Sequence, residues 1–99
     1  MKSNFNEALN LLRQGKIKKA KEICIENLNS QPNNPETYNL YAFILFHAKE
    51  FNEAIKNWNK AIEINPNFAE AYNNRGNVYL VLKKFNEAIY NYKKAIDIE

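Results

Sequence analysis

Residues 51–66 read FNEAIKNWNKAIEINP, and residues 85–98 read FNEAIYNYKKAIDI, which is nearly the same stretch 34 positions later. When the unit that contains the first copy is aligned with the unit that contains the second, 14 of the 31 comparable positions are identical. Extending this frame toward the N-terminus brings into register Ala20, Ala54 and Ala88, and also Pro32 and Pro66. A fixed period of this length is typical of repeat proteins, so we divide the chain into repeats 1–34, 35–68 and 69–99.

Each repeat carries the signals for two helices. Asn34 followed by Pro35 predicts an N-cap and a first helical residue, and this helix should run to about residue 48. Asn52 is predicted to cap a second helix, which Pro66 ends. The same plan in the third repeat predicts helices over 68–82 and 86–98. The expected fold class is therefore all-α, with six helices.

Small residues recur at matched places and indicate where helices approach each other. Ala8, Ala42 and Gly76 share one place in the first helix of the three repeats, and Ala20 with its equivalents shares another in the second helix. Small side chains allow two helix backbones to come close while aromatic side chains fill the space on either side. One helical hairpin cannot bury its apolar face alone, so the three repeats should stack into a single domain over 1–99.

With this pattern, the chain resembles the tetratricopeptide repeat (TPR) family over its whole length. The matching residues are Tyr38, Ala42, Phe51, Ala54, Trp58, Ala61 and Pro66, then Tyr72, Gly76, Tyr79, Phe85, Ala88, Tyr92 and Ala95, and in the first repeat Ala8, Leu11, Gly15, Ala20 and Pro32. The resemblance implies a right-handed superhelical solenoid of three helix-turn-helix repeats. It also implies that the first helix of each repeat lines a concave groove that takes an extended or helical peptide.

Two departures from the repeat pattern give further expectations. Gly15 holds the turn between the helices of the first repeat, whereas Lys49 and Lys83 hold it in the others. If this turn requires a positive φ, each lysine costs up to about 1 kcal/mol relative to glycine. The last hairpin, with Ile89 and Ile96, would lack an overlying neighbour, while family members commonly add a capping helix. Either the chain is cut from a longer protein or something else covers that end.

The resemblance and helical geometry together predict which side chains line the groove. The set is Phe5, Leu9 and Leu12 from the first repeat, Asn39, Phe43, Phe46 and His47 from the second, and Asn73, Asn77 and Leu80 from the third. Phe43 and Phe46 are expected to be exposed unless a ligand covers them, with packing against a neighbouring helix as the alternative. The asparagines could hold a peptide backbone, or they could reflect the 18 Asn of this chain.

One subfamily that resembles this fold, the chaperone-tail adaptors, holds a C-terminal carboxylate with Lys, Asn and Arg at fixed places in the groove. Here those places hold Phe5, Leu9, Leu40, Glu70 and Asn74. Capturing a carboxylate requires cations or hydrogen-bond donors, and Glu70 would repel it. We therefore do not expect this chain to act as a carboxylate clamp.

Composition limits the other classes of function. Of the net charge of +3, the excess lies in the first repeat, where Arg13, Lys16, Lys18, Lys19 and Lys21 cluster. The cluster lacks interleaved aromatics, so we read it as a solvated corner and give nucleic-acid or acidic-surface binding a lower rank. The single cysteine, Cys24, fits a reducing cytoplasm. One histidine and one cysteine make no metal site or nucleophile pair, so we expect no enzyme, no cofactor and no metal.

The sequence also contains no apolar stretch long enough to span a membrane, so no membrane partner is expected. The leading hypothesis is a cytoplasmic protein-interaction module or scaffold that binds a partner protein or peptide in the groove. The alternative hypothesis is a module that self-associates as a homo-oligomer, through the groove or through the C-terminal hairpin.

Overall fold

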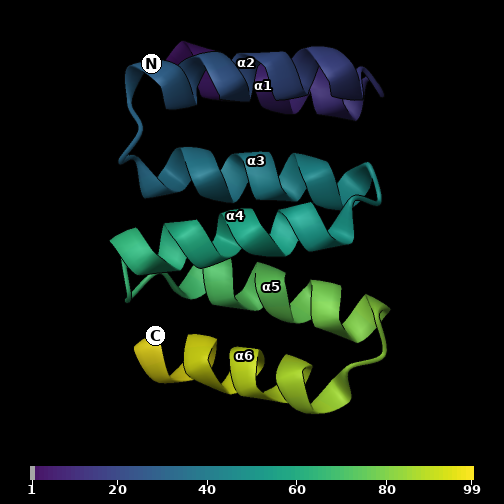
Figure 1. Cartoon of the computed structure of the whole chain (residues 1–99), viewed down its shortest axis with the longest axis vertical. Coiled ribbons are helices and arrows are strands. Elements are labelled where there is room, and N and C mark those ends of the chain that lie inside the picture. The colour runs from purple at the N-terminus through teal and green to yellow at the C-terminus, as the bar shows by residue number, and fades with distance from the viewer. Residues whose placement is uncertain (1) are drawn as a thin grey trace.

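The computed structural model describes the backbone of residues 2–99 and the side chains of residues 5–99. The described chain is all-α and consists of α1 (Lys2–Arg13), α2 (Ile17–Ser30), α3 (Pro35–His47), α4 (Phe51–Ile64), α5 (Ala69–Val81) and α6 (Phe85–Ile98). Figure 1 shows these helices as three successive hairpins stacked along the longest axis of the molecule. The expected fold class and the expected number of helices are confirmed.

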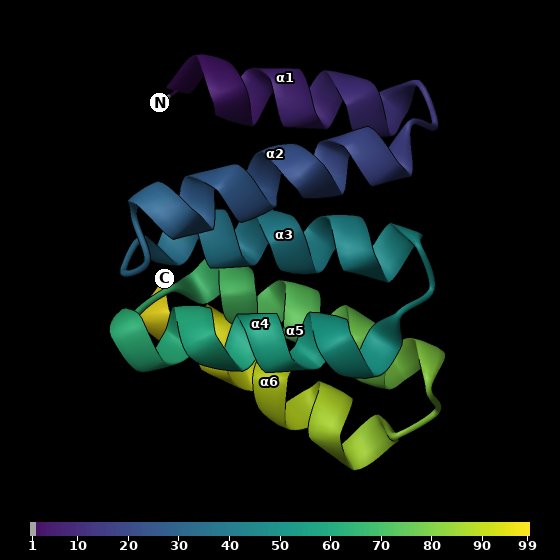
Figure 2. The same cartoon turned by 45° about the horizontal axis from the view of Figure 1, so that its top comes forward.

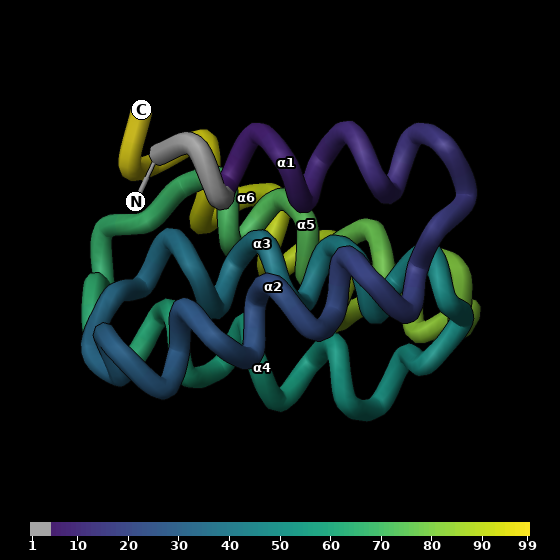
Figure 3. The backbone as a smooth tube through the Cα atoms, turned by 90° about the horizontal axis from the view of Figure 1, so that it is seen from above, coloured from purple at the N-terminus to yellow at the C-terminus, as the bar shows by residue number. Residues whose placement is uncertain are grey.

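The hairpins stack so that the first helices of successive repeats contact one another. Each helix packs against the next one along the chain, and in addition α1 contacts α3 and α3 contacts α5. In the tilted view of Figure 2, α1, α2 and α3 follow one another from the top, and α4 lies in front of α5. Seen from above, α1 lies on one side of α3 and both α2 and α4 lie on the other (Figure 3). The first helices therefore form a continuous inner surface, which carries the site described below.

The start of α3 forms as the sequence predicts. The side chain of Asn34 accepts a hydrogen bond from the backbone N–H of Glu36 at 3.0 Å, and Pro35 is the first helical residue. This bond satisfies one of the backbone donors that a helix leaves free at its N-terminus. The predicted cap at Asn52 is wrong, because α4 already begins at Phe51 and Asn52 lies inside its first turn.

The reason for this early start is the turn before α4. Lys49 has a φ of 63° and Lys83 a φ of 62°, as Gly15 has a φ of 78° in the first repeat. Around Lys49, the N–H of Glu50 donates to the carbonyl oxygen of Leu45 at 2.9 Å. This Schellman motif satisfies the last carbonyls of α3 and leads directly into α4. The turn therefore requires a positive φ in all three repeats, as the position of Gly15 indicates.

The core consists of two connected clusters. The larger one surrounds Trp58, which is fully buried together with Ala42 and Ala54, and the smaller one surrounds Ala8 and Ile44. The matched small residues lie where helices approach closely, as predicted. At Gly76, a Cβ atom would lie only 2.9 Å from the ring of Tyr92, so α5 and α6 could not pack this closely around a larger residue.

The two ends of the stack differ in polarity. At the C-terminal end, Ile89 and Ile96 are exposed, which agrees with the expectation that the last hairpin lacks an overlying neighbour. At the N-terminal end, α1 exposes polar side chains such as Asn6, Glu7 and Asn10. Within residues 2–99, none of the helices has the length and apolar character needed to cross a bilayer.

Candidate functional site

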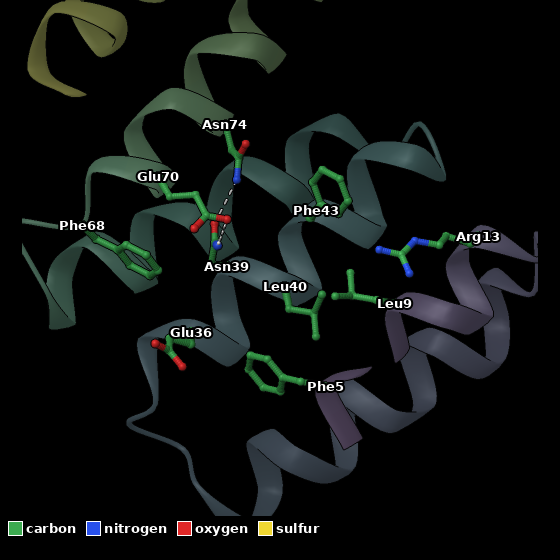
Figure 4. Close-up of a pocket in the computed structure, with 10 residues that line it drawn as sticks. All are labelled: Phe5, Leu9, Arg13, Glu36, Asn39, Leu40, Phe43, Phe68, Glu70 and Asn74. Carbon is green, nitrogen blue, oxygen red and sulfur yellow. Dashed lines mark hydrogen bonds between the residues drawn. The ribbon is translucent and has the colours of Figure 1, made fainter. Parts of the chain in front are cut away.

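The first helices of the three repeats enclose a pocket with a volume of about 500 Å³ (Figure 4). We call it the inner pocket. Its lining residues come from α1, α3, α5 and the turn before α5, and they are Phe5, Leu9, Arg13, Glu36, Asn39, Leu40, Phe43, Phe68, Glu70 and Asn74. Apolar side chains form its middle, and charged side chains lie toward its ends. Because each repeat contributes, the pocket exists only when the three repeats are stacked.

A hydrogen-bond network around the buried side chain of Asn39 lies along one wall of the inner pocket. The indole N–H of Trp58 donates to Asn39 Oδ1 at 2.7 Å, and Asn74 Nδ2 donates to the same oxygen at 3.2 Å. Asn39 Nδ2 in turn donates to Glu70 Oε2 at 3.3 Å. The buried amide of Asn39 thus connects the core of the second repeat to the carboxylate of Glu70, and it orients that carboxylate at the pocket.

Three ionisable side chains line the inner pocket. Glu36 and Glu70 occupy the same place in successive repeats, in the first turns of α3 and α5. Arg13 is at the C-terminal end of α1, and Figure 4 shows its guanidinium on the opposite side of the pocket from both carboxylates. Among the described residues, none of the three forms an ion pair. The pocket thus carries one more negative than positive charge, although the chain as a whole is basic.

Several of the residues predicted for the groove lie together. Phe5, Leu9, Asn39 and Phe43 line the inner pocket. Leu9 and Phe43 also line a neighbouring hollow, which adds Leu12, Arg13, Ile17 and His47. Seven residues are predicted from α1 and α3, and all of them except Phe46 are found in one continuous region of the inner surface.

The expected exposure of Phe43 and Phe46 is wrong, since both rings are half-buried and pack against the core. The centroid of the Phe46 ring lies 5.7 Å from that of Phe51 and 6.4 Å from that of Trp58. Phe43 packs edge-on against His47, with ring centroids 4.6 Å apart, and still presents a face to the pocket. The close approach of α3 and α4 turns Phe46 inward, so Phe46 contributes to folding and Phe43 to the pocket wall.

The three asparagines expected to lie side by side in the groove have different surroundings. Asn39 is buried and its oxygen is occupied by Trp58 and Asn74, so it is not free to bind a peptide backbone through that atom. Asn77 accepts a hydrogen bond from the hydroxyl of Tyr92 at 2.5 Å, and Asn73 lines a separate hollow near the C-terminus. Leu80 is exposed at the far end of α5.

The predicted groove set omits six of the pocket residues. Leu40, Glu70 and Asn74 appear in the sequence analysis only as places of the carboxylate clamp, and Arg13, Glu36 and Phe68 are not assigned to the groove at all. Arg13 was assigned to the basic cluster, and in the structure it lies at the pocket instead. Within the same cluster, Lys21 forms an ion pair with Glu50 at 2.9 Å. The members of the basic cluster therefore have different surroundings. Glu36 could have been found, because it lies 34 residues before Glu70.

The two residues with reactive side chains do not form a catalytic arrangement. Cys24 is fully buried, and burial raises the pKa of its thiol to about 12, so the nucleophilic thiolate does not form near neutral pH. The ring of His47 contacts two phenylalanine rings and lies at the edge of the neighbouring hollow. In the described part of the chain, His, Cys, Asp and Glu side chains do not gather into any group that could hold a metal ion.

Comparison with known proteins agrees with the repeat pattern. A family model described as TPR repeat matches residues 42–83, and a model described as tetratricopeptide repeat matches residues 69–99. No curated protein sequence matches the chain.

Several solved structures share the fold. The first TPR of Spaghetti (RPAP3), bound to the HSP90 peptide SRMEEVD, is similar with a TM-score of 0.90 and 26% sequence identity, over 98% of this chain and 77% of that chain. The TPR2B domain of yeast Sti1, in a complex with pHsp70, gives a TM-score of 0.90 and 25% identity, over 98% of this chain and 78% of that chain. The second TPR of Spaghetti gives a TM-score of 0.88 and 22% identity, over 98% and 90%.

Proposed function

The chain belongs to the tetratricopeptide repeat family, and we propose that it is a protein-interaction module that binds a segment of a partner protein in the inner pocket. The observation that carries this proposal is that a pocket of about 500 Å³ is formed jointly by the first helices of all three repeats. Pockets that bind ligands are typically concave, largely apolar and lined by a few fixed polar groups. The inner pocket has apolar walls, and one of its carboxylates is held by a buried amide.

The similar structures support a peptide ligand. Two of the three compared domains were solved with the HSP90 peptide SRMEEVD, and the third was solved in a complex with pHsp70. The inner pocket is open to solvent along the first helices, so an extended segment could lie across it. The remaining predicted residues, Leu12, Phe46, His47, Asn73, Asn77 and Leu80, are proposed as the surroundings of this site and not as its centre.

The test uses two phenylalanines of α3 as a matched pair. Binders are selected from a phage-displayed library of 12-residue peptides, and the affinity of one selected peptide is measured by fluorescence anisotropy. Phe43→Ala removes a pocket wall, so it should weaken binding by at least about tenfold, which is about 1.4 kcal/mol. Phe46→Ala removes a ring that packs on Phe51 and Trp58, so it should lower the thermal midpoint and leave the affinity of the folded protein nearly unchanged.

Two results would contradict the proposal. One is a selected peptide that binds Phe43→Ala as tightly as it binds the original protein. The other is a selection that returns no peptide above background. The amide signals of ¹⁵N-labelled protein provide an independent check, since binding should shift those of α1, α3 and α5 more than those of α6.

A second candidate function is self-association, and one observation favours it. The C-terminal hairpin exposes Phe85, Ile89, Tyr90 and Ile96, all large and apolar. Head-to-tail pairing has little support, because the opposite end of the stack presents polar residues of α1. Tail-to-tail pairing through α6 is the form to test, by sedimentation of the original protein and of Ile96→Lys. A monomer at all concentrations would reject it.

A further inference from the structure

The charges of the inner pocket point to the chemistry of its partner. We propose that the pocket selects a segment in which a lysine or arginine precedes or follows apolar residues, and that it discriminates against acidic segments and C-terminal carboxylates. This inference rests on the proposed function, and it adds the class of ligand. It depends on Glu36 and Glu70, on the apolar walls between them and Arg13, and on the finding that neither carboxylate pairs with a cation among residues 5–99.

The first step of the argument is that both carboxylates lie on the side of the pocket opposite Arg13. They come from equivalent places in α3 and α5, and Figure 4 shows both on the side of the pocket away from Arg13, Glu70 beside Asn39 and Glu36 beside Phe5. Within the described residues, neither forms an ion pair. A cation that entered this side of the pocket would be attracted by the negative charges, whereas an incoming carboxylate would be repelled by them.

The second step is that Glu70, although exposed, already has one hydrogen bond that directs its carboxylate toward the pocket. Its Oε2 accepts from Asn39 Nδ2 at 3.3 Å, and Asn39 is fixed by the indole N–H of Trp58 at 2.7 Å. A neutral amide donor leaves the charge of the carboxylate uncompensated and leaves lone pairs free for a second donor. An ammonium or guanidinium group would bind at these free lone pairs through a charge-assisted hydrogen bond.

The third step is that the walls suit the rest of a basic segment. Phe5, Leu40 and Phe43 form an apolar surface between the carboxylates and Arg13. The methylene stem of a lysine or arginine can lie along such a surface while its charged end reaches a carboxylate. Apolar side chains next to it would cover the rest of the surface. The guanidinium of Arg13 then faces the other end of the segment, where it favours a neutral or acidic residue.

The experiment compares matched peptides and needs no knowledge of the natural partner. The probes are an array of nine-residue peptides, acetylated at the N-terminus and amidated at the C-terminus, with varied apolar residues and one position that is Lys, Arg, Gln or Glu. A further set carries Glu with a free C-terminal carboxylate. Binding of labelled protein should favour Lys or Arg over Glu by about tenfold, because attraction and repulsion both act on this ratio.

The variants separate charge from shape. Glu70→Gln keeps a carbonyl oxygen for Asn39, so it preserves the network and should lower the ratio to about threefold. Glu36→Gln with Glu70→Gln should abolish the preference while peptides with Gln still bind. Glu26→Gln is the matched control, since Glu26 is an exposed carboxylate on α2 outside the pocket, and it should leave the ratio unchanged. Thermal midpoints of all variants confirm that they fold.

Each other outcome overturns the inference. A preference for Glu or for the free carboxylate reverses the sign of the proposed selection. Equal binding of basic, neutral and acidic peptides removes charge selection and leaves the proposed peptide-binding function standing. Absence of binding to every set contradicts both. A preference for basic peptides that survives the double variant would place the recognition elsewhere on the protein.

Discussion

Helices α4 and α6 have almost the same sequence and different surroundings. Ten of their 14 aligned residues are identical. In α4, Phe51, Ile55 and Ile62 pack against the core, because α4 lies between α3 and α5. The equivalent residues Phe85, Ile89 and Ile96 of α6 are 56%, 52% and 70% exposed. Among the described helices, α6 contacts α5 alone.

This difference shows what a repeat sequence does and does not specify. Contacts within a hairpin recur in both repeats, since Trp58 of α4 donates to Asn39 of α3 and Tyr92 of α6 donates to Asn77 of α5. The residues on the outer side of the second helix depend on a following hairpin, and their burial changes with position in the stack. The same substitution on the outer side should therefore change the free energy of unfolding by different amounts in α4 and α6. A substitution in the turns before these helices should change it equally.

The largest difference is expected at the aromatic residue of each second helix. Trp58 is fully buried and donates to Asn39, whereas Tyr92 is half-buried and donates to Asn77. Trp58→Ala should lower the free energy of unfolding by about 3–5 kcal/mol, and Tyr92→Ala by about half as much. The measurement is urea unfolding followed by circular dichroism.

Because a domain of this size is stable by only about 5–15 kcal/mol, Trp58→Ala could unfold much of the protein. Trp58→Phe therefore serves as a second variant. It removes the indole donor and keeps a ring, so it should cost about 1–3 kcal/mol. Equal losses for Trp58→Ala and Tyr92→Ala would mean that α6 is covered in solution as fully as α4.

An intermediate difference is expected at the outer isoleucines. Ile62→Ala removes a side chain that packs against the core, and it should cost about 1–3 kcal/mol. Ile96→Ala changes a side chain that is 70% exposed, so its effect should stay within about 0.5 kcal/mol. Urea unfolding at two protein concentrations tests both. A large, concentration-dependent loss for Ile96→Ala would show that another copy of the chain covers α6.

The sequence predicts the fold well because the signals of the fold are local and repeated. The 34-residue period, the cap at Asn34 and the small residues at Ala42 and Gly76 each act within one hairpin, so they can be read without knowing the rest of the structure. The predicted cap at Asn52 fails for a related reason. The Schellman motif around Lys49 connects α3 directly to α4, and the helix starts before the asparagine.

The site is harder to predict, because it depends on contacts between repeats. Helical geometry places Phe5, Leu9 and Phe43 on the inner surface, and the structure brings them to one pocket. The same geometry cannot show that Phe46 turns toward Trp58, because that contact joins two helices. Nor can it show that Asn39 is occupied, since its partners come from α4 and α5.

The smallest effect is expected in the turns, where the repeats should behave alike. Lys49→Gly and Lys83→Gly each replace a residue with φ near 60° by one that adopts this conformation without a steric cost. Each should raise the free energy of unfolding by about 0.5–1 kcal/mol, since relief of strain exceeds the extra entropy of glycine in the unfolded chain. Thermal unfolding of the two variants is the measurement.

Gly15 allows the reciprocal test in the first repeat. A Cβ atom at Gly15 would meet nothing within 4 Å, so Gly15→Ala changes the backbone preference and removes no packing. With a φ of 78°, it should destabilise the protein by about 1 kcal/mol. If Lys49→Gly stabilised the protein and Lys83→Gly did not, the turns too would depend on their place in the stack. The contrast between α4 and α6 would then reflect a general loosening of the last hairpin, and not the missing cover over its outer face.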